Sequence, residues 1–187
     1  MCHAHVPEQL VRYANELARV LMTDHPELLE AGERAAEQVR VSATTLGRPR
    51  PELLMAAARL HGVGHLPGVA KTGFVPVDGA VYLMGQGWPD PVVSLVGHQL
   101  QSRMVARYLG AGPQLSLITR IQGWPADILD FAILTTGPHG VRTVGQGLDA
   151  LRRQQDSDDR IPLRIRDQRL ARLSRAGRRV DEALTAA

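Results

Sequence analysis

Apolar residues recur at intervals of three and four positions along almost the whole of this chain. After Pro7, the first such run consists of Leu10, Val11, Ala14, Leu17, Ala18 and Leu21. This spacing places the apolar side chains on one face of an α-helix, and proline is well tolerated in the first turn of a helix. No segment alternates strictly between apolar and polar residues over more than a few positions, as a half-buried strand does. The pattern therefore favours an all-helical fold.

The same periodicity, with proline and glycine as punctuation, predicts the remaining helices. They are expected at residues 26–46, 52–61, 77–85, 91–109, 114–121, 125–134, 144–154 and 162–186. Residues 62–76, rich in glycine and proline, are predicted to form a loop. We expect one all-α domain over residues 1–187, a bundle of about seven to nine helices. It divides into an N-terminal helix within residues 1–24, a core at 26–155 and an Arg-rich final helix within 160–187.

Length and composition exclude several classes of protein. The 187 residues suit one domain whose core needs no disulfides or structural metal. The single cysteine, Cys2, excludes a disulfide framework and a cysteine-ligated zinc finger. No apolar run approaches the roughly 18 residues of a membrane span, and residues 1–5 do not resemble a signal peptide. A cytoplasmic protein without a membrane partner is the expectation.

The net charge of +3 is unevenly distributed along the chain. Residues 1–149 carry 12 basic and 13 acidic side chains, whereas the rest carry 10 arginines and 6 acidic residues. The final helix presents Arg164, Arg169, Arg172, Arg175, Arg178 and Arg179, which predicts a basic outer face beside an apolar stripe. A basic face can bind nucleic acid, but no aromatic residue follows Phe131 to stack on bases. We therefore favour a solvated surface over a nucleic-acid site.

Three histidines occupy positions where chemistry is plausible. His61 ends a predicted helix, His65 follows four residues later, and His98 follows a short apolar run. A His-x-x-x-His pair on a helix can bind zinc, but here glycines intervene and no glutamate is present to act as base. The alternative is that these imidazoles are hydrogen-bonded to backbone groups. Acidic residues that could complete a site are Asp78, Asp127 and Asp130, with Asp127 equally suited to a helix N-terminus.

Four segments in order resemble motifs of the HD-domain superfamily of metal-dependent phosphohydrolases, in particular its small bacterial single-domain members. They are residues 56–65 (AAARLHGVGH), 72–80 (TGFVPVDGA), 93–98 (VSLVGH) and 131–138 (FAILTTGP). Their order and spacing match the family over about residues 26–184. The resemblance implies an HD-like helical bundle, in agreement with the periodicity.

The resemblance also implies where a metal site would lie, and most of its ligands are missing. The family's first histidine falls at or near Gly32, its His-Asp pair becomes His61-Gly62, and its distant aspartate becomes Ile133. A hydrolytic metal needs several ligands and an open position for water, and Mg²⁺ or Mn²⁺ prefers anionic oxygens. We therefore expect a degenerate member of the family, a pseudoenzyme in respect of its metal chemistry, with no metal and no cofactor.

Three hypotheses follow from this pattern. In the first, a metal-free pocket binds a small molecule, and neutral histidines run a proton-transfer, elimination, isomerisation or cyclisation step. The catalytic candidates are His61 and His98, and the substrate-binding candidates are His65, Lys71, Asp78, Asp130, Thr135 and Thr136. In the second, the fold is a non-catalytic ligand-binding or protein-interaction module. The pattern is compatible with a homo-oligomer. In the third, a metallohydrolase survives with an altered ligand set that recruits His65, His98 or Asp130.

Overall fold

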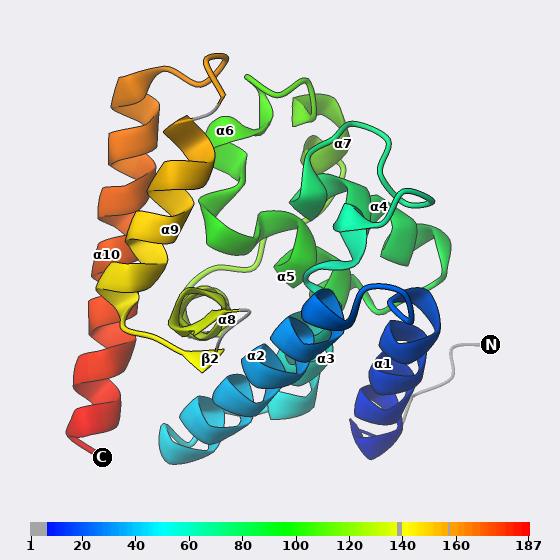
Figure 1. Ribbon diagram of the computed structural model, residues 1–187. Helices are drawn as coiled ribbons and strands as arrows, with labels where there is room; N and C mark the ends of the chain where they lie inside the picture. The colour runs from blue at the N-terminus through cyan, green and yellow to red at the C-terminus, as the bar shows by residue number, and fades with distance from the viewer. Residues whose placement is uncertain (1–6, 138–139, 157) are drawn as a thin grey trace.

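The computed structural model describes residues 7–137, 140–156 and 158–187, and most of these residues are helical (Figure 1). Its longer helices are α1 (Pro7–Leu21), α2 (Pro26–Thr45), α3 (Pro51–Leu60), α4 (Val75–Gly85), α5 (Asp90–His98), α8 (Trp124–Thr135), α9 (Val144–Asp156) and α10 (Leu163–Thr185). Two shorter α-helices are α6 (Arg103–Ala106) and α7 (Gly112–Ser116), and two 3-10 turns are η1 (Val63–His65) and η2 (Gln99–Gln101). The all-α class is confirmed. The part of the predicted N-terminal helix before Pro7 lies outside the described residues.

The prediction of one helix over residues 91–109 is wrong. The chain stops being helical after His98, turns through η2 and resumes as α6. Leu100 (φ 49°) and Gln101 (φ 54°) both adopt the left-handed conformation, which costs about 1–2 kcal/mol for a residue with a Cβ. The extra break raises the number of α-helices in the described residues to ten, compared with the seven to nine expected. Helix α7 is likewise shorter than the predicted 114–121.

Periodicity also missed a small β-hairpin, in which β1 (Thr136–Gly137) pairs antiparallel with β2 (Gly140–Val141). Two residues a strand are too few to produce an alternating pattern in the sequence. The hairpin follows α8 directly. It reverses the chain so that α9 can pack back against α8.

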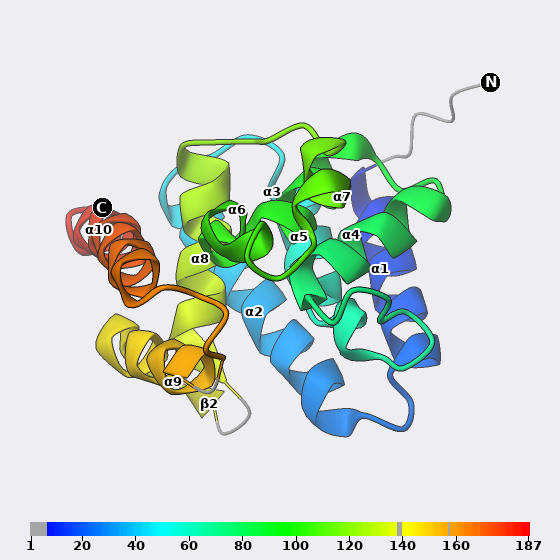
Figure 2. The same cartoon turned by 90° about the horizontal axis from the view of Figure 1, so that it is seen from above.

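Helix α8 lies at the centre of the fold. It packs against α2, α3 and α5 on one side and against α9 and α10 on the other, and Figure 2 shows it standing between these two groups. Its side chains Ile128, Leu129, Ala132 and Leu134 are almost fully buried. An apolar helix of this kind is typical of a core element surrounded by amphipathic neighbours. Within the described residues, no helix combines the length and the apolar character needed to cross a bilayer.

The final helix is less uniformly basic on its outside than its sequence predicts. Arg169 is only 5% exposed and donates its Nε–H to the Leu100 carbonyl at 2.7 Å, so its assignment to the solvated face is wrong. Arg166 is also buried, and it donates to the carbonyls of Ile161 and Asp158. The remaining arginines of the predicted basic face, Arg164, Arg172, Arg175, Arg178 and Arg179, are exposed. Packing against both α8 and α9 buries a wider face of α10 than its apolar stripe alone.

Helices α2 and α3 approach each other very closely at Gly32. A Cβ atom added at Gly32 would lie 2.6 Å from the carbonyl oxygen of Arg59 on α3. Such a distance is well inside van der Waals contact, and the obstacle is the Arg59 backbone rather than a flexible side chain. Beside this contact the Arg59 side chain, 2% exposed, donates to the Leu29 carbonyl and to Glu33 on α2. Glycine at position 32 is therefore a packing requirement of this helix pair.

We expect Gly32→Ala to lower the free energy of unfolding by about 1–3 kcal/mol, because the added methyl group must push α2 and α3 apart. Chemical denaturation monitored by circular dichroism measures the change. Gly85→Ala in α4 is the matched control, since no atom lies within 4 Å of its added Cβ. Alanine there should be neutral or stabilising by up to about 1 kcal/mol. Equal effects of the two substitutions would contradict the close-contact explanation.

Candidate functional site

Of the two histidines predicted to be catalytic, His61 lies at the end of α3 and is engaged with the backbone. Its Nδ1 lies 2.7 Å from the Ala58 carbonyl oxygen, and its own carbonyl accepts a hydrogen bond from Gln99 Nε2 at 2.9 Å. Burial lowers the pKa of His61, the Ala58 carbonyl opposes that shift, and neighbouring His65 adds to it. His61 is therefore a neutral imidazole that joins the end of α3 to η2.

His65, Lys71 and Asp78 occupy the loop and helix that follow α3. His65 lies at the end of η1 and is exposed to solvent on one side. Partial desolvation of its ring by the neighbouring residues lowers its pKa. Lys71 is exposed in the loop before α4. Asp78, 3% exposed, accepts hydrogen bonds from the backbone N–H groups of Thr72 and Gly73 and from the Thr72 hydroxyl at 2.8 Å. Its carboxylate fixes this loop on the first turn of α4.

The two threonines predicted to bind substrate lie at the junction of α8 and β1, and their hydroxyl groups donate to carbonyl groups of α8. Thr135 donates to the Phe131 carbonyl at 2.8 Å, and Thr136 donates to the Ala132 carbonyl at 2.7 Å. Each is 5% exposed. Neither hydroxyl donor is free for a ligand in this arrangement.

His98, the other predicted catalytic histidine, lies beside a pocket and has one nitrogen without a partner. Its Nε2 lies 3.0 Å from the Ile118 carbonyl oxygen, which can only accept, so Nε2 carries the proton of the neutral ring. Nδ1 is then a lone-pair acceptor, and it is buried without a hydrogen-bond partner. Burial lowers the pKa of His98, the Ile118 carbonyl opposes the shift, and the charges of Arg120 and Arg103 add to it.

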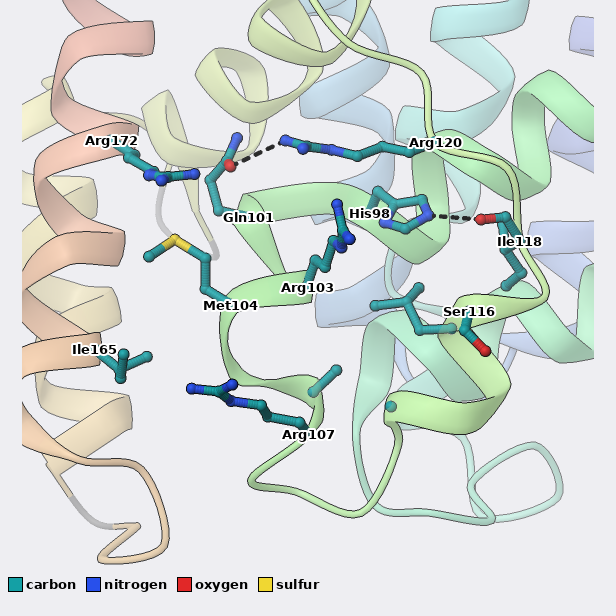
Figure 3. Close-up of a pocket in the computed structure, with 13 residues that line it drawn as sticks. His98, Gln101, Arg103, Met104, Arg107, Ser116, Ile118, Arg120, Ile165 and Arg172 are labelled. Atoms are coloured by element: carbon teal, nitrogen blue, oxygen red, sulfur yellow. Dashed lines mark hydrogen bonds between the residues drawn. The ribbon is translucent and has the colours of Figure 1, made fainter.

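The pocket beside His98 has a volume of about 730 Å³ and is bounded by α5, η2, α6, α7, the segment after α7, and α10 (Figure 3). Its floor is partly apolar, with Met104, Leu115, Ile118 and Ile165. Its polar walls carry His98, Gln101, Ser116 and four arginines: Arg103, Arg107, Arg120 and Arg172. In Figure 3 the side chains of Arg103 and Arg120 lie beside His98, and Arg107 lies toward the other end.

The pocket has a strong excess of positive charge. Its lining includes no aspartate or glutamate, and none of the four guanidinium groups forms an ion pair within the described part of the chain. Arg120 donates to Gln101 Oε1 at 3.3 Å, and Arg107 bonds the Tyr108 hydroxyl and lies 4.6 Å from the centre of its ring. Four cations that line one pocket, without ion-pair partners among the described residues, raise the local potential and favour an anion.

Asp130 on α8 lies behind this pocket and supports its wall. It is 2% exposed, its Oδ1 accepts the Leu100 backbone N–H, and its Oδ2 accepts from Gln101 Nε2 at 3.4 Å. Arg169 holds the carbonyl of the same Leu100. Burial raises the pKa of Asp130 to about 7, although the two hydrogen bonds and the charges of Arg169 and Arg120 act in the opposite direction. Asp130 thus fixes the turn between His98 and Arg103.

The residues at the positions that the HD-domain resemblance assigns to metal ligands do not fit a metal ion. The Gly32 position has no room even for a Cβ, and Ile133 is buried in the apolar core at 9% exposure. Across the described residues, no group of three or more His, Cys, Asp or Glu side chains is close enough to hold a metal. We therefore derive no chemistry through such an ion.

The structure divides the predicted residues rather than gathering all of them. His98 lines the pocket, and Asp130 contacts it through Gln101, whereas His61, His65, Lys71, Asp78, Thr135 and Thr136 are not among its lining residues. Sequence reasoning missed the four pocket arginines and Gln101. The i, i+4 spacing of Arg103 and Arg107 was a visible signal, but Arg120 and Arg172 join them only through the tertiary fold. Comparisons with protein-family models, with curated proteins and with solved structures found no match for this chain.

We expect His98 to be neutral at pH 7, in the tautomer with the proton on Nε2. Its titration midpoint should lie below the ordinary value of about 6.5, because burial and two nearby arginines disfavour the imidazolium ion. Nitrogen NMR of ¹⁵N-histidine-labelled protein, assigned with His98→Gln, measures the tautomer and the midpoint. A midpoint above 7 would contradict this electrostatic description.

Asp130 should make the unfolding free energy depend on pH. Its pKa is about 7 in the folded chain and about 3.9 when unfolded, so the folded state binds the extra proton between these values. Its contribution to stability is then largest at acidic pH and decreases, by on the order of 4 kcal/mol, as pH rises from about 4 to about 7. Buried histidines shift stability the opposite way, so the measurement is the difference between wild type and Asp130→Asn in urea melts at several pH values. An unchanged difference across this range would contradict the assigned pKa.

Proposed function

We propose that the protein binds an anionic small molecule in the pocket formed by α5, α6, α7 and α10. The observation that carries this proposal is the lining itself: four arginines, no carboxylate and no ion pair to any of the four within the described residues. A guanidinium group donates two parallel hydrogen bonds to a carboxylate or a phosphate, so the shared ligand chemistry is a planar or tetrahedral oxyanion.

The size and the floor of the pocket restrict the ligand further. A volume of about 730 Å³ lies within the range of sites for small molecules and cofactors. Met104, Leu115, Ile118 and Ile165 provide an apolar surface for a carbon skeleton. His98 Nδ1 is a buried acceptor without a hydrogen-bond partner among the described residues, which costs about 1–3 kcal/mol, so a ligand whose O–H or N–H donor reached this atom would recover that energy.

Proton transfer by His98 is the second candidate function, and one specific observation favours it. The Ile118 carbonyl holds the ring so that the basic Nδ1 is unprotonated at neutral pH and free of partners. A bound anion would offset the charges of Arg103 and Arg120 and thereby stabilise the imidazolium ion formed when Nδ1 accepts a proton. Such a site would perform acid–base chemistry without a metal, as the sequence hypothesis requires.

The HD-domain resemblance remains part of the proposal, as the origin of the scaffold. On this view the chain descends from a metal-dependent phosphohydrolase that lost its ligands when α2 and α3 closed at Gly32 and Ile133 entered the core. On the same view, the pocket beside His98 became the functional site. Its support is the order of the four motifs and the all-helical fold.

Isothermal titration calorimetry with sulfate, inorganic phosphate and succinate at low ionic strength tests the binding proposal. We expect binding that weakens as NaCl is added, since mobile ions screen the charges. Arg103→Ala and Arg172→Ala should each weaken it about tenfold or more, because a hydrogen bond to a charged group contributes about 1.5–3 kcal/mol. Preference for phosphate or for the dicarboxylate distinguishes the two ligand classes.

Arg178→Ala is the matched control, because this arginine is exposed on the same helix but does not line the pocket. It removes the same charge and should change affinity less than about twofold. Equal losses in Arg172→Ala and Arg178→Ala would show that net charge, and not the pocket, attracts the anion. If none of the three ligands binds, the proposed function is overturned.

A further inference from the structure

The wall of the pocket contains a hydrogen-bond chain whose direction is set from the protein interior. Asp130 Oδ2 accepts from Gln101 Nε2 at 3.4 Å, and Gln101 Oε1 accepts from Arg120 Nη2 at 3.3 Å. A carboxylate can only accept, so it draws the NH₂ end of the Gln101 amide toward itself. The oxygen of the amide must then face Arg120, as Figure 3 shows for the last link.

The donor–acceptor direction of these hydrogen bonds reverses if Asp130 gains a proton. The Oδ2–H group would donate to Gln101 Oε1, while Oδ1 keeps the Leu100 N–H and the turn at η2 is preserved. The amide then presents its NH₂ group to the pocket, and Arg120 loses the acceptor that occupies one of its N–H groups. The pocket gains two donors and loses one nearby negative charge.

We propose that Asp130 is a positioning residue of the anion pocket: its carboxyl sets which end of the Gln101 amide faces Arg120, and protonation of this carboxyl increases the affinity for an anion. This inference rests on the proposed anion-binding function. It assigns to Asp130 a role through Gln101 rather than contact with the ligand, because Asp130 is buried on α8 and is not a lining residue.

The surroundings of Asp130 place its titration in an accessible range. Burial raises its pKa to about 7, against the hydrogen bonds from Leu100 and Gln101. The charged groups that act on it are Arg169 from α10 and Arg120 from the segment between α7 and α8. The other elements that pack against α8, namely α2, α3, α5, α9, η2 and β1, bring no further charge that acts on its pKa among the described residues.

The sign of the effect follows from linkage. An anion binds better to the form with protonated Asp130, so affinity rises as pH falls through about 7 and is highest below it. Burial lowers the pKa of His98 in the free protein, and the variant His98→Gln separates any titration of this imidazole from that of Asp130 between pH 6.5 and 8.

Calorimetric titration with sulfate, whose charge is constant over this range, tests the proposal. Wild type should bind about fivefold more tightly at pH 6.5 than at pH 8. Asp130→Asn carries a permanent NH₂ group where the carboxyl proton would be, so it should bind with the tight affinity at both pH values. His98→Gln should retain the pH dependence over this window.

A second variant keeps the test decisive if Asp130→Asn does not fold. Gln101→Met removes the amide but leaves Asp130 in place, so Arg120 is released at every pH and most of the pH dependence should vanish. If either Asp130→Asn or Gln101→Met keeps the pH dependence of the wild type, the inference is overturned. A loss of affinity in Asp130→Asn that is the same at both pH values would also overturn it, because a merely structural role of Asp130 predicts that result. If wild type binds none of sulfate, inorganic phosphate and succinate at any pH, the proposed function fails as well, whereas anion binding with no change in affinity between pH 6.5 and 8 rejects this inference alone.

Discussion

The turn at Leu100 and Gln101 is the constraint on which the pocket depends. Two successive residues with a Cβ adopt the left-handed conformation there, at a cost of about 1–2 kcal/mol each. The conformation persists because both polar groups of the Leu100 backbone are taken by buried charged side chains, the N–H by Asp130 and the carbonyl by Arg169. Each of these charges also reduces the desolvation penalty of the other. The pocket takes its wall from both sides of the turn, with His98 before it and Arg103 after it.

The helical class and most helix positions could be predicted from the sequence, because apolar periodicity and proline positions are local signals. The break after His98 could not, since Gly97 is the only glycine or proline between Pro91 and Gly110 and it lies within helix α5. Its causes are a carboxylate and a guanidinium group that are distant in sequence, at positions 130 and 169. The burial of Arg169 was missed for the same reason: an arginine on an amphipathic helix looks exposed until a partner carbonyl is placed beside it.

The site could be predicted only in part. His98 was named because it follows an apolar run, and Asp130 because it lies three residues from Asp127 on one predicted helix. The arginines were missed because nothing in the sequence distinguishes them from the other basic residues, of which the chain has 22 in all. They line one pocket only because α10 packs against α6 and η2. Asp78 and the two threonines had the residue types of a binding site, but the structure gives their side chains to local backbone groups.

The contact between α2 and α3 at Gly32 also limits which side chains position 32 can carry. Because the two helices touch through backbone, every side chain larger than that of glycine costs packing energy, since even the methyl group of alanine meets the Arg59 carbonyl. A longer side chain such as histidine could be accommodated at this position only after other substitutions had separated the two helices, and those would weaken the packing that buries Arg59. Position 32 is therefore closed to a side-chain ligand for as long as α2 and α3 keep their present spacing.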